Sequence, residues 1–161
     1  LTIFSTGIMD DAMDHIWIEN HRAQIRRIII EEGLVSIAGT AFQGLPNLVE
    51  VQLPNTLMRI GVYAFSGCIQ LKSLVIPASV VEIENFAFGR CDALRQVYFL
   101  GDAPNMPNNI FNMDTLYVYY PANNETWKGR MWDYGGKITW VSRDYGAGYP
   151  LFIIEEPKRK A

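Results

Sequence analysis

Two cysteines are the side chains of this sequence best suited to chemistry. Cys68 and Cys91 are separated by a 23-residue interval, and the equivalent position one interval earlier holds Leu45. Thiolates act as nucleophiles and metal ligands, and two thiols on neighbouring strands, about 5 Å apart, could form a disulfide. The leucine indicates a buried position, where cysteine behaves as a small apolar residue. We therefore expect unpaired core thiols, with a disulfide as the alternative and a redox or catalytic role as the least favoured interpretation.

A metal site is the second candidate. His15 and His21 lie near three carboxylates, those of Asp10, Asp11 and Asp14. A helical zinc pair needs histidines at i and i+4, and a calcium loop needs alternating oxygen ligands closed by a glutamate. This segment has neither spacing, so the sequence favours a solvated segment and predicts no bound metal.

The sequence contains no familiar catalytic arrangement. It has no nucleophile elbow and no phosphate-binding glycine loop, and its histidines and cysteines fall in different segments. We therefore expect a protein that is not an enzyme and has no cofactor. The net charge of −3 argues against nucleic-acid binding, and no apolar run approaches the roughly 20 residues of a membrane-spanning helix. No secretory leader is visible, and the start at Leu1 suggests a piece of a longer chain.

The elements that position these side chains follow a 23-residue repeat. A phenylalanine recurs at this interval, at Phe42, Phe65, Phe88 and Phe111. Further columns keep the interval: Ala41, Ala64 and Ala87; Leu45, Cys68 and Cys91; Leu48, Leu71 and Leu94; Ile28, Val51, Leu74 and Val97; Ile30, Leu53, Ile76 and Phe99; Leu34, Leu57 and Val80; and Ile37, Ile60 and Ile83. All these positions are apolar, whereas an apolar fraction of 49% would fill about half of them by chance. A fixed interval of this length is typical of a solenoid, in which stacked repeats bury a continuous core.

Each repeat contains one clear strand followed by a turn. Apolar residues alternate at Leu74 and Ile76, and Pro77 follows them, as Pro54 follows the equivalent strand one repeat earlier. Proline lacks an N–H group and ends a strand ladder. The chain then returns to the next strand and carries an Ala-Phe pair on the way. The phenylalanines of successive repeats are therefore expected to stack in single file.

The repeats resemble a known family. The blocks IGVYAFSGCIQL at 60–71 and LVIPASVVEI at 74–83 look like the BspA-type leucine-rich repeat, and the flanks at 1–9 and 119–140 resemble segments that often border such repeats. The first repeat departs from the pattern at Leu45, where cysteine is usual, and at Glu31, where proline is usual. The resemblance implies a leucine-rich-repeat solenoid, a right-handed α/β or mainly-β horseshoe with capped ends. It also implies a secreted or wall-attached bacterial protein involved in adhesion.

The repeat pattern divides the chain into four segments. These are an N-terminal cap at 1–24, leucine-rich repeats at 25–111 of which the last is degenerate, a C-terminal strand and cap at 112–142, and a linker or tail at 143–161. We expect a strand at 1–4 and a final strand at 116–119. Trp127, Trp132 and Trp140 are expected to cover the exposed end of the core.

The solvent-facing side of the repeated strands, here called the strand face, is the candidate binding site. Alternation places one column, here called the outer column, at Ile29, Gln52, Val75 and Tyr98, and extends it to Tyr117. Beside it run Arg27, Glu50, Ser73 and Gln96, and then Arg26, Val49, Lys72 and Arg95. Aromatic side chains are enriched at protein interfaces. The candidate binding residues are Ile29, Gln52, Val75, Tyr98, Tyr117, Tyr119, Glu50, Lys72 and Arg95. The competing interpretation is that scattered exposed apolar residues have no function.

Two functions follow from these patterns. The first is a non-catalytic, monomeric recognition module at the bacterial cell surface, which binds a protein or glycan partner through the strand face. The second is a structural spacer that positions other domains of a longer secreted or surface protein. The sequence does not identify the ligand.

Overall fold

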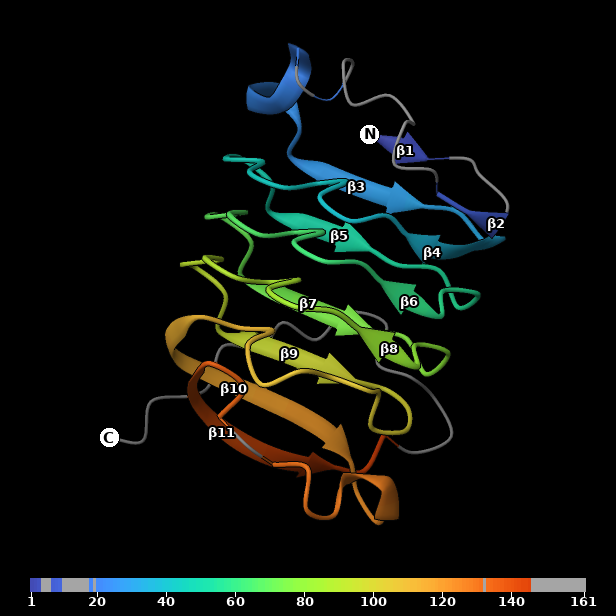
Figure 1. The fold of residues 1–161 in the computed structure, drawn as a ribbon, viewed down its shortest axis with the longest axis vertical. Coiled ribbons are helices and arrows are strands. Elements are labelled where there is room, and N and C mark those ends of the chain that lie inside the picture. Colours follow the sequence, from blue (N-terminus) through green and yellow to red (C-terminus); the bar gives the residue numbers. More distant parts are fainter. Residues whose placement is uncertain (4–6, 10–17, 19, 132, 146–161) are drawn as a thin grey trace.

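The computed structural model describes residues 1–3, 7–9, 18, 20–131 and 133–145, and it shows a solenoid of parallel strands (Figure 1). The first row of strands consists of β1 (Thr2–Ile3), β3 (Arg27–Ile30), β5 (Glu50–Gln52), β7 (Ser73–Ile76), β9 (Gln96–Phe99), β10 (Met113–Pro121) and β11 (Gly136–Arg143). The second row consists of β2 (Gly7–Ile8), β4 (Leu34–Ile37), β6 (Arg59–Ile60) and β8 (Glu82–Ile83). Short 3₁₀ turns lie at η1 (Arg22–Gln24) and η2 (Glu125–Trp127). The mainly-β form of the expected solenoid is therefore the one observed.

Successive coils are held in register by backbone pairing. In the first row, β3 pairs with β5 so that Arg27 lies opposite Glu50, and β7 pairs with β9 so that Val75 lies opposite Tyr98. Strands β5 and β7 are also in contact, so the two hydrogen-bonded sheets of this row form one continuous face. The second row repeats the 23-residue register, with Ile60 opposite Ile83. The predicted interval is confirmed as one coil of the solenoid.

The phenylalanine column forms the expected single file. Ring centroids are 5.2 Å apart between Phe42 and Phe65, and 5.9 Å apart in each of the next two pairs, Phe65–Phe88 and Phe88–Phe111. All four rings are buried and stack almost in parallel. The other apolar columns line the same core, except that Val51 on the short β5 and Leu53 just after this strand are only partly buried.

The turns after the first-row strands are fixed by hydroxyl groups as well as by proline. The Leu57 amide donates to the Pro54 carbonyl, and the Val80 amide donates to the Pro77 carbonyl. Thr56 Oγ1 donates to the Leu34 carbonyl at 2.9 Å and Ser79 Oγ donates to the Leu57 carbonyl at 2.6 Å, so both turns are also bonded to the coil before them. The turn residues therefore contribute to coil stacking as well as to the change of chain direction.

The end of the solenoid differs from the sequence prediction. The strand expected at 116–119 is part of β10, but it is not the final strand, because β11 adds a further parallel strand beyond it. The prediction failed because residues 120–142 were assigned to a cap. The alternation of Ile138 and Trp140, both packed against the core, is the signal for this strand.

Two of the three predicted tryptophan lids are confirmed. Trp127 is fully buried, and its ring centroid lies 4.9 Å from that of Phe99 and 5.7 Å from that of Trp140. The Trp127 indole N–H donates to the carbonyl of Gly101 at 3.1 Å. These rings close the core at this end because each has a broad apolar surface and the buried N–H has a partner. Trp132 lies outside the described residues.

At the other end, the strand expected at 1–4 is observed as β1. The acidic segment with Asp10, Asp11, Asp14 and His15 lies outside the described residues, as does most of the tail at 143–161. The four-segment division of the chain therefore remains a prediction.

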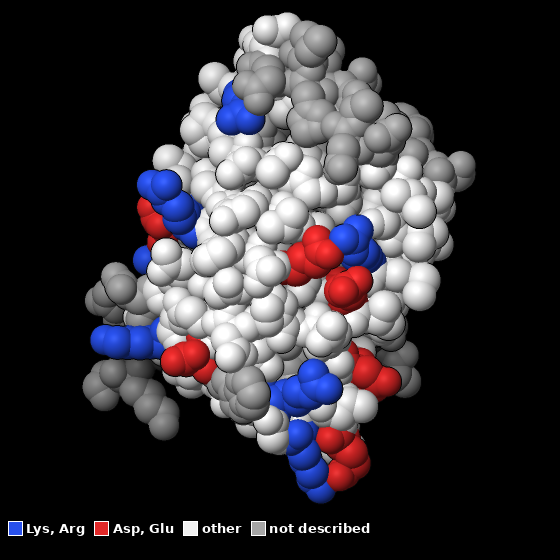
Figure 2. All heavy atoms as spheres, in the orientation of Figure 1, with Lys and Arg blue, Asp and Glu red and all other residues white. Residues whose placement is uncertain are grey.

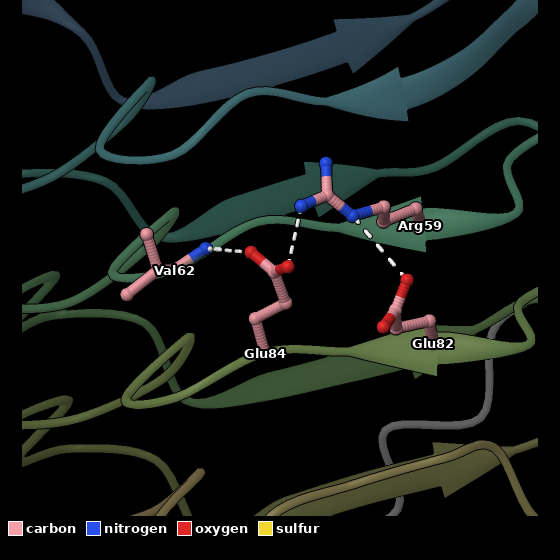
Figure 3. Close-up of polar contacts among 4 residues, drawn as sticks. All are labelled: Arg59, Val62, Glu82 and Glu84. Atoms are coloured by element: carbon pink, nitrogen blue, oxygen red, sulfur yellow. Dashed lines mark hydrogen bonds and ion pairs between the residues drawn. The ribbon is translucent and has the colours of Figure 1, made fainter.

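Oppositely charged side chains lie side by side in the middle of the face drawn in Figure 2. An ion-pair network lies on the outer side of the second row (Figure 3), where the Arg59 guanidinium is paired with the carboxylates of Glu82, at 3.3 Å, and Glu84. Glu84 also accepts a hydrogen bond from the Val62 amide at 2.9 Å. These side chains are partly exposed, and exposed ion pairs contribute about 0–1 kcal/mol. We assign the network to coil stacking because all of its contacts are between neighbouring coils.

Candidate functional site

The strand face begins as predicted. Backbone pairing places Ile29 opposite Gln52 and Val75 opposite Tyr98, as predicted for these two pairs of the outer column, and the contact between β5 and β7 brings the two pairs together. Gln52 and Val75 are exposed, whereas Ile29 and Tyr98 are half-buried. Regular coils place these side chains in a line because successive strands in a parallel sheet are about 4.8 Å apart.

The predicted extension of this column to Tyr117 is wrong. Tyr117 lies opposite Gln96, in the neighbouring column, and it is Tyr119 that lies opposite Tyr98. The interval from Tyr98 to Tyr119 is shorter than one regular repeat, because the degenerate repeat after Phe99 does not keep the 23-residue spacing. Val141 on β11 occupies the next place in the outer column.

Tyr98 and Tyr119 form an aromatic stack on the strand face. Their ring centroids are 4.5 Å apart and their planes differ by 8°. The Arg143 guanidinium carbon lies 4.9 Å from the Tyr119 ring centroid, in a cation–π contact on β11. Tyr119 is only 7% exposed as a result, so it supports Tyr98 and does not offer a free surface of its own.

Tyr145 was not among the predicted site residues, and it lies beside this stack. Its hydroxyl is buried and has no hydrogen-bond partner among the described residues. Burial raises the pKa of Tyr145 to about 12, with the positive charge of Arg143 acting in the opposite direction. Burial also raises the pKa of Tyr98. Neither Arg143 nor Tyr145 was predicted, because both lie after residue 142, where the repeat pattern ends and a linker or tail was expected.

Charged residues line the side of the strand face where the strands begin. Figure 2 shows mostly positive spheres along the margin at which β5, β7 and β9 start in Figure 1. Arg26, Lys72 and Arg95 share one column here, and all three are exposed. Glu50, a predicted binding residue, is paired with Arg27 at 2.7 Å, so its charge is already compensated. The exposed carboxylate of Asp92 also lies here, three residues before Arg95, so positive charges outnumber negative ones among the unpaired side chains named on this side.

The two cysteines are buried and unpaired, as the favoured prediction has it. The Cys68 thiol donates to the Phe42 carbonyl at 3.3 Å, and the Cys91 thiol donates to the Phe65 carbonyl at 3.2 Å. Burial raises the pKa of the Cys68 thiol to about 11 and raises that of Cys91 further. Thiolates are the reactive form of cysteine, so neither side chain is suited to nucleophilic chemistry at neutral pH.

The thiol pKa shifts predict a loss of stability at alkaline pH. Because folding favours the neutral thiols, they stabilise the folded chain fully at pH values below their ordinary pKa of 9.0. This stabilisation is lost as the pH rises through about 11, the pKa of Cys68 in the folded chain. We expect the free energy of unfolding to fall over this interval in chemical denaturation experiments. The double variant Cys68→Ala, Cys91→Ala should show a smaller fall, whatever its stability at neutral pH. Equal falls in both proteins would contradict the assignment.

Within the part of the chain that the structure describes, no group of three or more His, Cys, Asp or Glu side chains is placed to hold a metal ion. His21 belongs to no such group among the described residues, and the other members of the candidate metal site are outside the described residues. No helix among the described residues is both long enough and apolar enough to cross a membrane.

Comparison with known proteins identifies the family. Residues 20–134 match the BspA type Leucine rich repeat region, in six copies. The fold is similar to that of the pneumococcal vaccine antigen PcpA, with a TM-score of 0.56 and 20% identity, over 72% of this chain and 36% of PcpA. A leucine-rich repeat protein from Bacteroides ovatus ATCC 8483 aligns with a TM-score of 0.49 and 23% identity, over 72% of this chain and 30% of that chain.

This chain therefore spans about a third of the length of each of these two structures. No curated protein matches the sequence. The family match covers most of the chain and includes every coil from β3 to β10. The chain belongs to the BspA-type leucine-rich-repeat family.

Proposed function

We propose that this chain is a non-catalytic recognition module that binds a protein or glycan partner through the strand face. The observation that carries the proposal is the outer column, which presents exposed Gln52 and Val75 next to the supported ring of Tyr98. A continuous, side-chain-lined face of this kind is how solenoids bind extended partners. The second row is a weaker candidate for a binding surface, because the charged side chains at its centre are paired with one another in the Arg59 network.

We further propose that the module acts at the cell surface or in a secreted protein of a bacterium. Support comes from membership of the BspA-type family and from the fold shared with a vaccine antigen of pneumococcus. The activity of the whole parent protein belongs to the same proposal, because this chain covers only part of the length of its structural relatives.

The test compares two exposed positions on opposite rows. The purified chain is screened against immobilised extracellular matrix proteins and a glycan array, alongside the variants Gln52→Glu on the strand face and Met58→Glu on the second row. We expect Gln52→Glu to reduce binding to a captured partner by at least about tenfold, and Met58→Glu to leave it unchanged. Capture that survives Gln52→Glu but not Met58→Glu would move the site to the second row. No capture at all would favour the spacer role.

A further inference from the structure

Among the residues that the structure describes, the aromatic stack of the strand face ends at Tyr98. Arg143, Tyr119 and Tyr98 follow one another along the solenoid axis, at separations of 4.9 Å and 4.5 Å. The next member of the outer column is Val75, which lies opposite Tyr98 on β7 and is 46% exposed. The Tyr98 ring therefore has one face against Tyr119, while its other face is directed toward the coil that carries Val75.

The Val75 side chain is too short to fill its place in the column. Side chains stand roughly perpendicular to a sheet, and the isopropyl group of valine ends well below the level of a tyrosine ring. A planar group above Val75 would lie one strand spacing from Tyr98, about 4.8 Å, which is a stacking distance. We call this place the stacking position: it is bounded by Tyr98, by Val75 below and by the exposed Gln52 one coil further on.

Positive charge lies within reach of the stacking position. Lys72 is on the same coil as Val75, three residues earlier, or about 10 Å along the strand. Arg26 and Arg95 occupy the same column as Lys72, and all three side chains are exposed. Arg95 donates to the backbone carbonyls of Asp92 and Leu94, which hold its side chain near the strand, and it forms no ion pair with a carboxylate of the described residues.

Resting on the proposed function, we propose that the strand face binds an acidic segment of a partner protein, with one aromatic side chain of that segment stacked on Tyr98 above Val75. The carboxylates of the segment lie along the column of Arg26, Lys72 and Arg95. The aromatic ring becomes the next member of the existing stack, and Tyr119 and Arg143 hold Tyr98 in place before binding. This preorganisation lowers the entropic cost of association.

The floor of the stacking position favours an aromatic side chain over a sugar ring. A pyranose carries hydroxyl groups around its edge, and each hydroxyl that loses water needs a new hydrogen-bond partner. Val75 provides none, Gln96 is buried, and Glu50 is already bonded to Arg27, so among these neighbours only the amide of Gln52, at one end of the position, can bond a hydroxyl. An apolar floor with charge at a distance instead fits an aromatic residue followed by carboxylates.

The test uses a displayed library of random short peptides, selected against the full 161-residue chain. We expect the recovered peptides to be enriched in an aromatic residue together with Asp or Glu. The affinity of a recovered peptide is then measured for Val75→Trp, which fills the stacking position with a ring of the chain itself. The matched control is Val81→Trp, which places the same side chain at an exposed valine of the second row.

We expect Val75→Trp to weaken peptide binding by at least about tenfold, and Val81→Trp to leave it unchanged. The double variant Lys72→Glu, Arg95→Glu should weaken binding as well, and thermal melting checks that each variant is folded. Peptides without aromatic and acidic enrichment, or unchanged affinity for Val75→Trp, would overturn this inference. If binding is then still lost in Gln52→Glu, the proposed function stands. A glycan signal without peptide recovery would overturn the inference alone, and no binding in either screen would overturn both.

Discussion

Replacement of Phe65 by alanine is expected to lower the free energy of unfolding by about 3–5 kcal/mol. Phe65 is fully buried in the middle of the phenylalanine file, with Phe42 at 5.2 Å on one side and Phe88 at 5.9 Å on the other. The substitution removes a buried ring from the core and leaves a cavity. It also removes two stacking contacts, each of which contributes about 0.5–1.5 kcal/mol. The backbone of the neighbouring coils is tied by hydrogen bonds, so the gap cannot close fully. For example, the Phe65 amide donates to the Ala87 carbonyl at 2.8 Å.

The measurement is chemical denaturation of the wild type and the variant, followed by circular dichroism. Tyr63→Ala is the matched control, because Tyr63 is an aromatic residue of the same loop that is 37% exposed and stacks on Phe86 outside the core. We expect the control to cost about 1 kcal/mol. A Phe65→Ala variant no less stable than the Tyr63→Ala variant would show that the single file is not a main source of stability.

The core could be predicted because the constraint that creates it is periodic. A 23-residue coil returns each position to the same place, so Phe42 and Phe65, or Ile60 and Ile83, must share one environment. Burial in that environment removes apolar area from water, which is the dominant favourable contribution to folding. The interval alone therefore identified the buried columns and the direction of stacking, and the proline turns at Pro54 and Pro77 identified where the strands end.

The candidate site was predicted only where the same periodicity holds. Ile29, Gln52, Val75 and Tyr98 were placed correctly, but the degenerate repeat shifted the register, so that Tyr119 replaced Tyr117 in the outer column. Arg143 supports the stack from β11, a strand that no repeat column indicated. Beyond a break in the repeat, the residues that pair depend on how the irregular connection folds. The length of that connection alone does not determine the register.

Backbone conformation at the corners was also beyond sequence reasoning. Thr40, Tyr63 and Phe86 occupy equivalent places and all have positive φ, at 59°, 56° and 55°. Glycine or asparagine would have indicated such a position, because other residues adopt this conformation at a cost of about 1–2 kcal/mol. Here the cost is offset by the packing of the coil, and residue type gives no sign of it. The same limit applies to the close approach of neighbouring coils, which appears in the sequence only as an isolated glycine.

Gly61→Ala tests that close approach, and we expect it to destabilise the protein by about 2–3 kcal/mol. A Cβ atom at Gly61 would lie 2.6 Å from the Gly39 nitrogen and 2.8 Å from both the Ala38 carbonyl carbon and the Ile37 oxygen. These are backbone atoms of the preceding coil, so the collision can be relieved only by moving the coils apart. That movement would stretch the hydrogen bond from the Gly61 amide to the Ile37 carbonyl, which is 3.0 Å long.

Chemical denaturation together with amide hydrogen exchange separates this effect from a general loss of stability. Gly89→Ala is the matched control, because a Cβ there meets only ordinary contacts, the nearest at 3.4 Å, and the reduced freedom of the unfolded chain favours alanine. We expect its stability to stay within about 1 kcal/mol of the wild type. In Gly61→Ala, protection should fall first at Gly39–Phe42, whose Thr40 and Phe42 amides donate to the coil of Gly61 at 2.8 Å. If both variants were equally stable, neighbouring coils could move apart at less cost than the backbone contacts imply. The alignment of the strand face would then depend on side-chain packing alone.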